Sequence, residues 1–77
     1  MEEFKTSDFY KAAFLVAKQK NLIRIDDIHE KRATFVFEND GTIKDLVHAY
    51  DFGGVQVMLD ARKLFQSIKE VKRILYQ

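Results

Sequence analysis

The chain has 77 residues, 47% of them hydrophobic and 13% aromatic, and this composition predicts one small globular domain over residues 1–77 rather than a disordered segment. The absence of cysteine excludes disulfides and cysteine-based zinc sites, and no apolar run approaches the ~18 residues that a membrane-spanning helix needs. The net charge of +1 is unevenly distributed: residues 26–60 carry eight acids and three bases, whereas residues 61–77 carry five bases and one acid, which permits an anionic partner at the basic end.

The first predicted element is a helix that begins after Thr6 or Ser7, because either hydroxyl can accept from the free amides of a first helical turn. Between Phe9 and Ala17 only Lys11 is polar. A helix this apolar should be covered on more than one side. We expect it to end at Asn21, a residue type that tolerates the left-handed conformation of a helix C-terminus.

Two strands follow, at residues 22–28 and 32–38, with the polar residues 29–31 joining them as a hairpin. In the first strand Ile23 and Ile25 share a face. In the second strand Phe35 and Phe37 share a face, and Val36 is an apolar exception on the opposite one.

The second half of the chain predicts a helix, a strand and a helix. A capping box of Thr42 with Asp45 begins a short helix that ends at Gly53-Gly54. Residues 55–59 alternate as a third strand, and Asp60 caps a last helix over residues 61–76. The expected buried stripe of that helix is Ala61, Leu64, Phe65, Ile68, Val71 and Leu75. The sequence therefore predicts an α+β fold in the order α-β-β-α-β-α, with three helices on a small, mainly antiparallel three-stranded sheet.

Three stretches of the chain carry a resemblance. They are Lys5-Thr6-Ser7-Asp8-Phe9-Tyr10-Lys11-Ala12-Ala13, with the pattern K-T-S-D-x-Y-x-A-A, and the segments Phe35–Glu38 and Val57–Phe65. With them the chain resembles, from residue 5 to about residue 76, a family of short proteins of unknown function from bacteria, archaea, phages and mobile elements. The resemblance implies no known activity, substrate or cofactor, but it implies small standalone proteins, often in a mobile-element setting. The chain departs from the family where Gln19-Lys20-Asn21 stands in place of a usual glycine after the first helix.

Nothing in the sequence predicts catalysis, so we expect no catalytic residues, no bound cofactor and no small-molecule substrate. Ser7 and Ser67 lack the context of an activated nucleophile. Asp26 and Asp27 are adjacent on a predicted strand and point to opposite faces. Gly53-Gly54 leads into a predicted strand rather than a helix, which is the wrong order for a phosphate-binding loop.

A metal site is also not expected. His48 shares a helix face with Asp45 and Asp51, but a closed site needs three or four ligands with suitable geometry, and a solvated polar face explains the same residues. The start of the first helix, Lys5 to Asp8, could hold a phosphate. A simple helix cap explains it better, because Asp8 already occupies the positive end.

The last helix carries a basic surface that could contact nucleic acid through phosphate neutralisation. Its residues are Arg62, Lys63, Gln66, Lys69, Lys72 and Arg73. The alternative is a solvated outer face, since cations near a helix C-terminus also suit the helix dipole.

Four apolar residues, Tyr50, Phe52, Met58 and Tyr76, have no clear place in the periodic stripes and could form an interface for a protein partner. In a chain this short they could equally complete a thin core, and a homodimer would compensate for a small core. The leading hypothesis is a non-enzymatic cytoplasmic interaction module that binds a protein partner or itself and modulates a host or defence complex. The alternative is a small nucleic-acid-binding protein that uses the basic helix.

Overall fold

The computed structural model describes residues 2–29, 31–53 and 58–76. Its elements are β1 (Glu3–Thr6), α1 (Phe9–Ala17), β2 (Leu22–Asp26), β3 (Thr34–Glu38), α2 (Ile43–Phe52) and α3 (Ala61–Leu75). The predicted α+β class, with three helices and a three-stranded antiparallel sheet, is confirmed for these residues. The predicted order was wrong, because the chain runs β-α-β-β-α-α.

The difference in order comes from the third strand of the sheet. β3 lies at the centre, and β1 and β2 pair with it on either side, both antiparallel. Of the strand predicted at residues 55–59, residues 55–57 lie outside the described residues, and Met58 and Leu59 have no strand structure. β1, near the N-terminus, is the third strand of the described sheet.

The predicted β2–β3 hairpin is confirmed, although one face of β2 differs from the prediction. A register irregularity between Leu22 and Arg24 places Leu22 opposite Phe37 and Ile25 opposite Phe35. Ile23, which was expected to share a face with Ile25, is left partly exposed. A bulge of this kind shifts the alternation of side chains by one residue.

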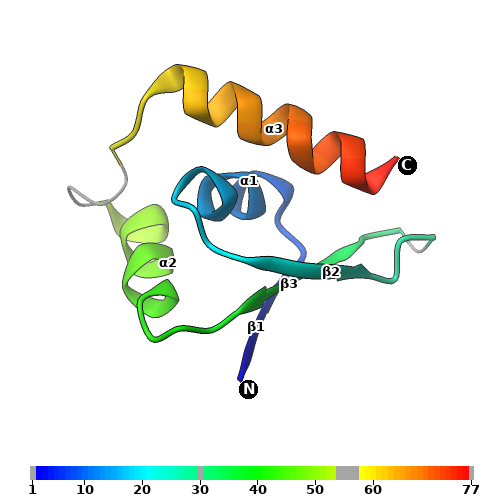
Figure 1. Ribbon diagram of the computed structural model, residues 1–77. Coiled ribbons are helices and arrows are strands. Elements are labelled where there is room, and N and C mark those ends of the chain that lie inside the picture. The colour runs from blue at the N-terminus through cyan, green and yellow to red at the C-terminus, as the bar shows by residue number, and fades with distance from the viewer. Residues whose placement is uncertain (1, 30, 54–57, 77) are drawn as a thin grey trace.

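The strongly apolar helix α1 lies between the sheet and α3, with α2 at its side (Figure 1). Ala12, Ala13 and Leu15 are fully buried, which confirms the expectation that more than one side of α1 is covered. Adjacent alanines leave room for neighbouring elements to approach the helix backbone closely. The buried cluster comprises Ala12, Ala13, Phe14, Leu15, Phe35, Phe37, Ile43 and Val71.

The two ends of α1 differ from the predicted caps. Asp8 is the N-cap, and its Oδ1 accepts from the backbone N–H of Tyr10 at 3.0 Å and of Lys11 at 3.1 Å. Thr6 Oγ1 instead accepts from the N–H of Asp8 at 3.1 Å. Thr6 and Ser7 were therefore the wrong caps, since an aspartate carboxylate also suits the positive end of the helix dipole.

At its C-terminus α1 ends at Ala17 rather than at Asn21. Gln19 has a φ of 64°, and its N–H donates to Val16 O while the N–H of Lys20 donates to Leu15 O. This pair of hydrogen bonds around a left-handed residue is the Schellman arrangement that normally favours glycine. Gln19, in the segment where the resemblance led us to expect a glycine, is therefore a place where this chain bears backbone strain.

We expect Gln19→Gly to raise the free energy of unfolding by about 0.5–1 kcal/mol, because relief of the left-handed strain exceeds the extra chain entropy of glycine. Urea unfolding followed by circular dichroism measures the change. Gln19→Ala keeps the Cβ atom and should give no gain. A Gln19→Gly variant no more stable than Gln19→Ala would contradict the expectation.

The start of α2 is organised by Asp40. Its Oδ1 accepts from the N–H of Thr42 at 3.0 Å and from Thr42 Oγ1 at 2.7 Å, and its Oδ2 lies 3.1 Å from Lys20 Nζ. These hydrogen bonds, followed by the attraction of Lys20, lower the pKa of Asp40 to about 2. The predicted capping box was wrong, because the Thr42 side chain makes no cap hydrogen bond to the helix.

The sheet face turned away from α1 is closed by charges. Arg24 donates from Nη1 and Nη2 to the Glu3 carboxylate at 2.7 and 3.0 Å, and from Nε to Asp26 at 3.0 Å. Since Arg24 is on β2 and Glu3 on β1, this bridge crosses the central strand, where Val36 is fully buried. The hydrogen bonds from Arg24 also lower the pKa of Glu3. Val36, the apolar exception of its strand, is explained by this cover.

Candidate interaction surfaces

An apolar groove lies between α1, α2 and the start of α3. It has a volume of about 550 Å³, and its lining consists of Tyr10, Phe14, Tyr50, Met58, Leu59, Ala61 and Leu64. Tyr10 is 63% exposed and Met58 is 72% exposed. The chain therefore presents large apolar side chains to solvent around a concave surface.

The walls of the apolar groove are held by contacts between elements that are distant in sequence. Lys11 Nζ lies 3.0 Å from Asp51 Oδ1 and 5.6 Å from the centre of the Tyr50 ring. That ring packs on Phe14 with a centroid separation of 5.2 Å, and its burial raises the pKa of the Tyr50 hydroxyl. These contacts join α1 to α2 along the wall of the groove.

A second lysine connects α1 to the segment before α3. Lys18 Nζ donates to the carbonyl oxygen of Met58 at 2.8 Å and lies 5.8 Å from the centre of the Phe14 ring. Together with the ion pair of Lys11, this contact means that the cations at the rim already have partners. The groove consequently favours apolar rather than anionic groups.

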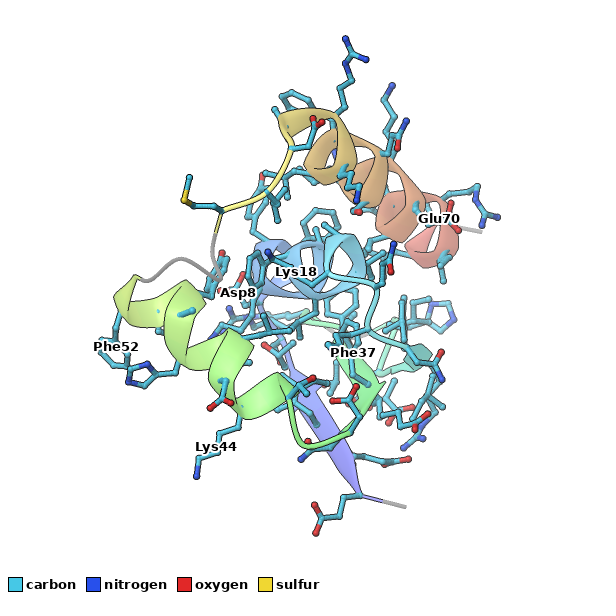
Figure 2. The ribbon with its side chains drawn as sticks, turned by 60° about the vertical axis from the view of Figure 1, so that its left-hand side comes forward. Asp8, Lys18, Phe37, Lys44, Phe52 and Glu70 are labelled. Carbon is cyan, nitrogen blue, oxygen red and sulfur yellow. The ribbon has the colours of Figure 1, made fainter. Side chains whose placement is uncertain are left out.

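The four residues predicted as a protein interface do not lie on one surface. Tyr50 and Met58 line the apolar groove. Phe52 is 77% exposed and points away from α1 and α3 at the end of α2 (Figure 2), beside the ring of His48. Tyr76, 78% exposed, lies beyond the other end of α3.

Tyr10 is the groove residue that the sequence reasoning missed. It lies in the apolar run of α1, for which the expectation was cover on more than one side. It lines the apolar groove and also a second groove beside it. Its ring meets Phe9 edge-on at 5.3 Å.

The second groove, here called the basic groove, lies between the start of α1, the β2–β3 connection and the end of α3. Its volume is about 360 Å³, and its lining consists of Ser7, Phe9, Tyr10, Lys31, Arg32, Ala33, Phe35, Lys72, Leu75 and Tyr76. Three of these residues are cations and none is an acid. The groove therefore combines positive charge with aromatic rings.

The six residues predicted to contact nucleic acid on α3 are all exposed, but they do not form one surface. At 100° per residue, Arg62, Gln66, Lys69 and Arg73 share the outer face, whereas Lys63 and Lys72 lie on opposite flanks. Arg73 is paired with Glu70 through two hydrogen bonds, which lower the pKa of that carboxyl. Lys72 is the one of the six that lines the basic groove.

Two members of the expected buried stripe of α3 were wrong. Ala61 and Phe65 are exposed, whereas Val71 is fully buried. Phe65 lies on the same flank of the helix as Tyr76, at positions i and i+11. The helix therefore places two aromatic rings outside the core.

The residues considered for metal binding are engaged elsewhere. Asp51 pairs with Lys11, and the His48 ring packs against Phe52 at 4.9 Å. Within residues 2–29, 31–53 and 58–76 there is no group of three His, Asp or Glu side chains that could hold a metal ion. In the same ranges no helix is long and apolar enough to cross a membrane.

The fold and its surfaces define a small α+β domain with an apolar groove and a basic groove that share one tyrosine. The chain belongs to the family described as Domain of unknown function (DUF5659), whose model matches residues 1–77. The comparisons with curated proteins and with solved structures gave no match.

Proposed function

We propose that the chain is a non-enzymatic interaction module that binds another protein through the apolar groove, and that a second copy of the chain is its partner. The observation that carries the proposal is the groove itself, a concave apolar surface with Tyr10 and Met58 largely exposed. Soluble monomers rarely leave contiguous apolar surface of this kind uncovered unless it binds something.

A second copy fits because the same chain also presents protruding apolar side chains. Phe52, Phe65 and Tyr76 are all exposed, and none of them lines the apolar groove. In a symmetric dimer, the groove of each copy would receive an exposed apolar side chain of the other copy. Association would also enlarge the core of a domain whose size limits its stability.

Sedimentation velocity at increasing protein concentration tests the proposal. We expect a concentration-dependent dimer, which Met58→Glu weakens at least about tenfold because it places a charge at the mouth of the groove. Gln66→Glu is the matched control. It introduces the same carboxylate at an exposed position of α3 outside the groove, and it should leave association unchanged.

Two results would contradict the proposed dimer. A chain that remains monomeric at high micromolar concentration contradicts the second copy as partner. Equal weakening by Met58→Glu and Gln66→Glu would show that net charge, rather than the groove, governs association.

For the biological setting, we propose modulation of a host or defence complex, which rests on the resemblance of the opening residues to short proteins of phages and mobile elements. The test is the gene neighbourhood: genes of phage or mobile-element type beside this one support the setting. Neighbours restricted to host metabolic operons contradict it.

A second candidate function is nucleic-acid binding through the outer face of α3. Its support is that Arg62, Gln66 and Lys69 are exposed together on the helix that forms the outermost layer. A gel-shift titration at low and moderate salt tests it. Binding that survives Arg62→Glu with Lys69→Glu would exclude this face.

A further inference from the structure

The basic groove brings together three cations from segments far apart in the sequence. Lys31 and Arg32 come from the connection between β2 and β3, and Lys72 comes from the last turns of α3. Among the described residues, none of the three forms a salt bridge, whereas Lys11, Lys20 and other cations do. Like charges gathered in a groove whose described lining contains no acid create a positive potential that an anion would stabilise.

Helix geometry accounts for only part of this charge. A lysine near the C-terminus of α3 suits the helix dipole, which explains Lys72 alone. Lys31 and Arg32 lie outside any helix. The nearby start of α1 is not the anion site, because Asp8 already accepts from its free amides.

Two tyrosines stand beside the cations. Tyr10 is 63% exposed and Tyr76 is 78% exposed, and they reach the basic groove from α1 and from the end of α3. Exposed aromatic rings next to positive side chains are the arrangement with which proteins bind single strands: bases stack on the rings while cations neutralise the phosphates. Apolar docking alone would not need the three cations.

We infer that the basic groove binds single-stranded nucleic acid, with bases stacked on Tyr10 and Tyr76 and phosphates against Lys31, Arg32 and Lys72. The site differs from the outer face of α3, and it shares Tyr10 with the apolar groove. Duplexes are disfavoured because their bases are stacked inside the helix and present no free face to the tyrosines.

Fluorescence anisotropy of a labelled short oligothymidylate measures the affinity at several salt concentrations. We expect binding at low salt with a slope of log K against log salt of about −2, since each of three neutralised phosphates contributes about −0.7. Tyr76→Ala should weaken binding about 5- to 150-fold through loss of one stacked base. Stacking should also change the tyrosine emission, which is readable because the chain has no tryptophan.

Matched variants separate the groove from general charge. Arg32→Glu should weaken binding and flatten the salt slope, whereas Lys44→Glu makes the same charge change at an exposed position on α2 and should alter affinity less than about twofold. Phe52→Ala is the corresponding control for Tyr76→Ala, because it removes an exposed ring outside the groove. All four positions are exposed, and circular dichroism verifies that the variants fold.

Several results would overturn the inference. These are no binding at low salt, equal losses for Arg32→Glu and Lys44→Glu, or an unchanged affinity in Tyr76→Ala. A duplex or a mononucleotide bound as tightly as the oligonucleotide would also refute it, as would loss of binding only in Arg62→Glu with Lys69→Glu.

Discussion

Phe37→Ala should lower the free energy of unfolding by about 3–5 kcal/mol, the usual cost of removing a fully buried aromatic ring. Phe37 lies on the central strand, opposite Phe4 of β1 and Leu22 of β2, and has no exposed surface. The ring therefore fills space at which all three strands meet. A domain of this length has a total stability of about 4–12 kcal/mol, so the substitution should remove at least about a quarter of it.

Urea unfolding of the two proteins, followed by far-ultraviolet circular dichroism, measures this loss. Phe52→Ala is the matched control, since Phe52 is exposed at the end of α2 and its removal should change stability by less than about 0.5 kcal/mol. If both variants lost the same stability, Phe37 would not be the centre of the core. If association through exposed rings adds to the measured stability, the comparison should be repeated at low protein concentration, where the chain is monomeric.

The hairpin containing Phe37 was predictable because two periodic signals agreed there. Phe35 and Phe37 share a face between the polar residues Thr34 and Glu38, and a polar stretch joins their strand to the one before. What alternation could not predict is the cover on the second face. Val36 is buried there because Arg24 reaches across the sheet to Glu3, and Glu3 comes from a strand that the sequence did not reveal.

β1 was missed for a physical reason. It has four residues with one large apolar side chain, Phe4, and short edge strands need little intrinsic preference when a central strand supplies their hydrogen bonds. The residues Lys5 to Asp8 were assigned to a helix start, which is correct only for Asp8. A strand and a helix cap therefore overlap within one short motif.

The two grooves could not be predicted because each is built from segments that come together only in the fold. Periodicity identified the outer face of α3, where spacing along one helix is enough. It could not place Lys31 beside Lys72, or Tyr10 beside Met58. Of the four predicted interface residues, Tyr50 and Met58 share a groove, whereas Phe52 and Tyr76 lie elsewhere.

Val71→Glu tests whether the layer formed by α3 is required by the rest of the fold. Val71 is fully buried on the side of α3 that faces α1. The substitution removes the burial of an apolar side chain, worth about 1.5–3 kcal/mol, and forces an unpaired carboxylate either into the core or into solvent with the helix. We expect the free energy of unfolding to fall by at least about 3 kcal/mol. The new carboxylate has no partner in the core, and it can reach solvent only if α3 separates from α1.

The expected consequence is unfolding of the whole domain rather than release of α3 alone. Ala12, Ala13 and Leu15 are fully buried in α1, which is covered by the sheet and by α3. Loss of either cover would expose a helix with little polar surface of its own. Gln66→Glu introduces the same side chain on the exposed face of α3. The free energy of unfolding of this variant should lie within about 0.5 kcal/mol of the parent protein's. Hydrogen exchange distinguishes unfolding of the whole domain from release of α3 alone. If protection is lost only in α3 and retained in α1, β2 and β3, the sheet alone is sufficient to hold α1. That result would contradict the two-sided cover that we infer from the apolar sequence of α1.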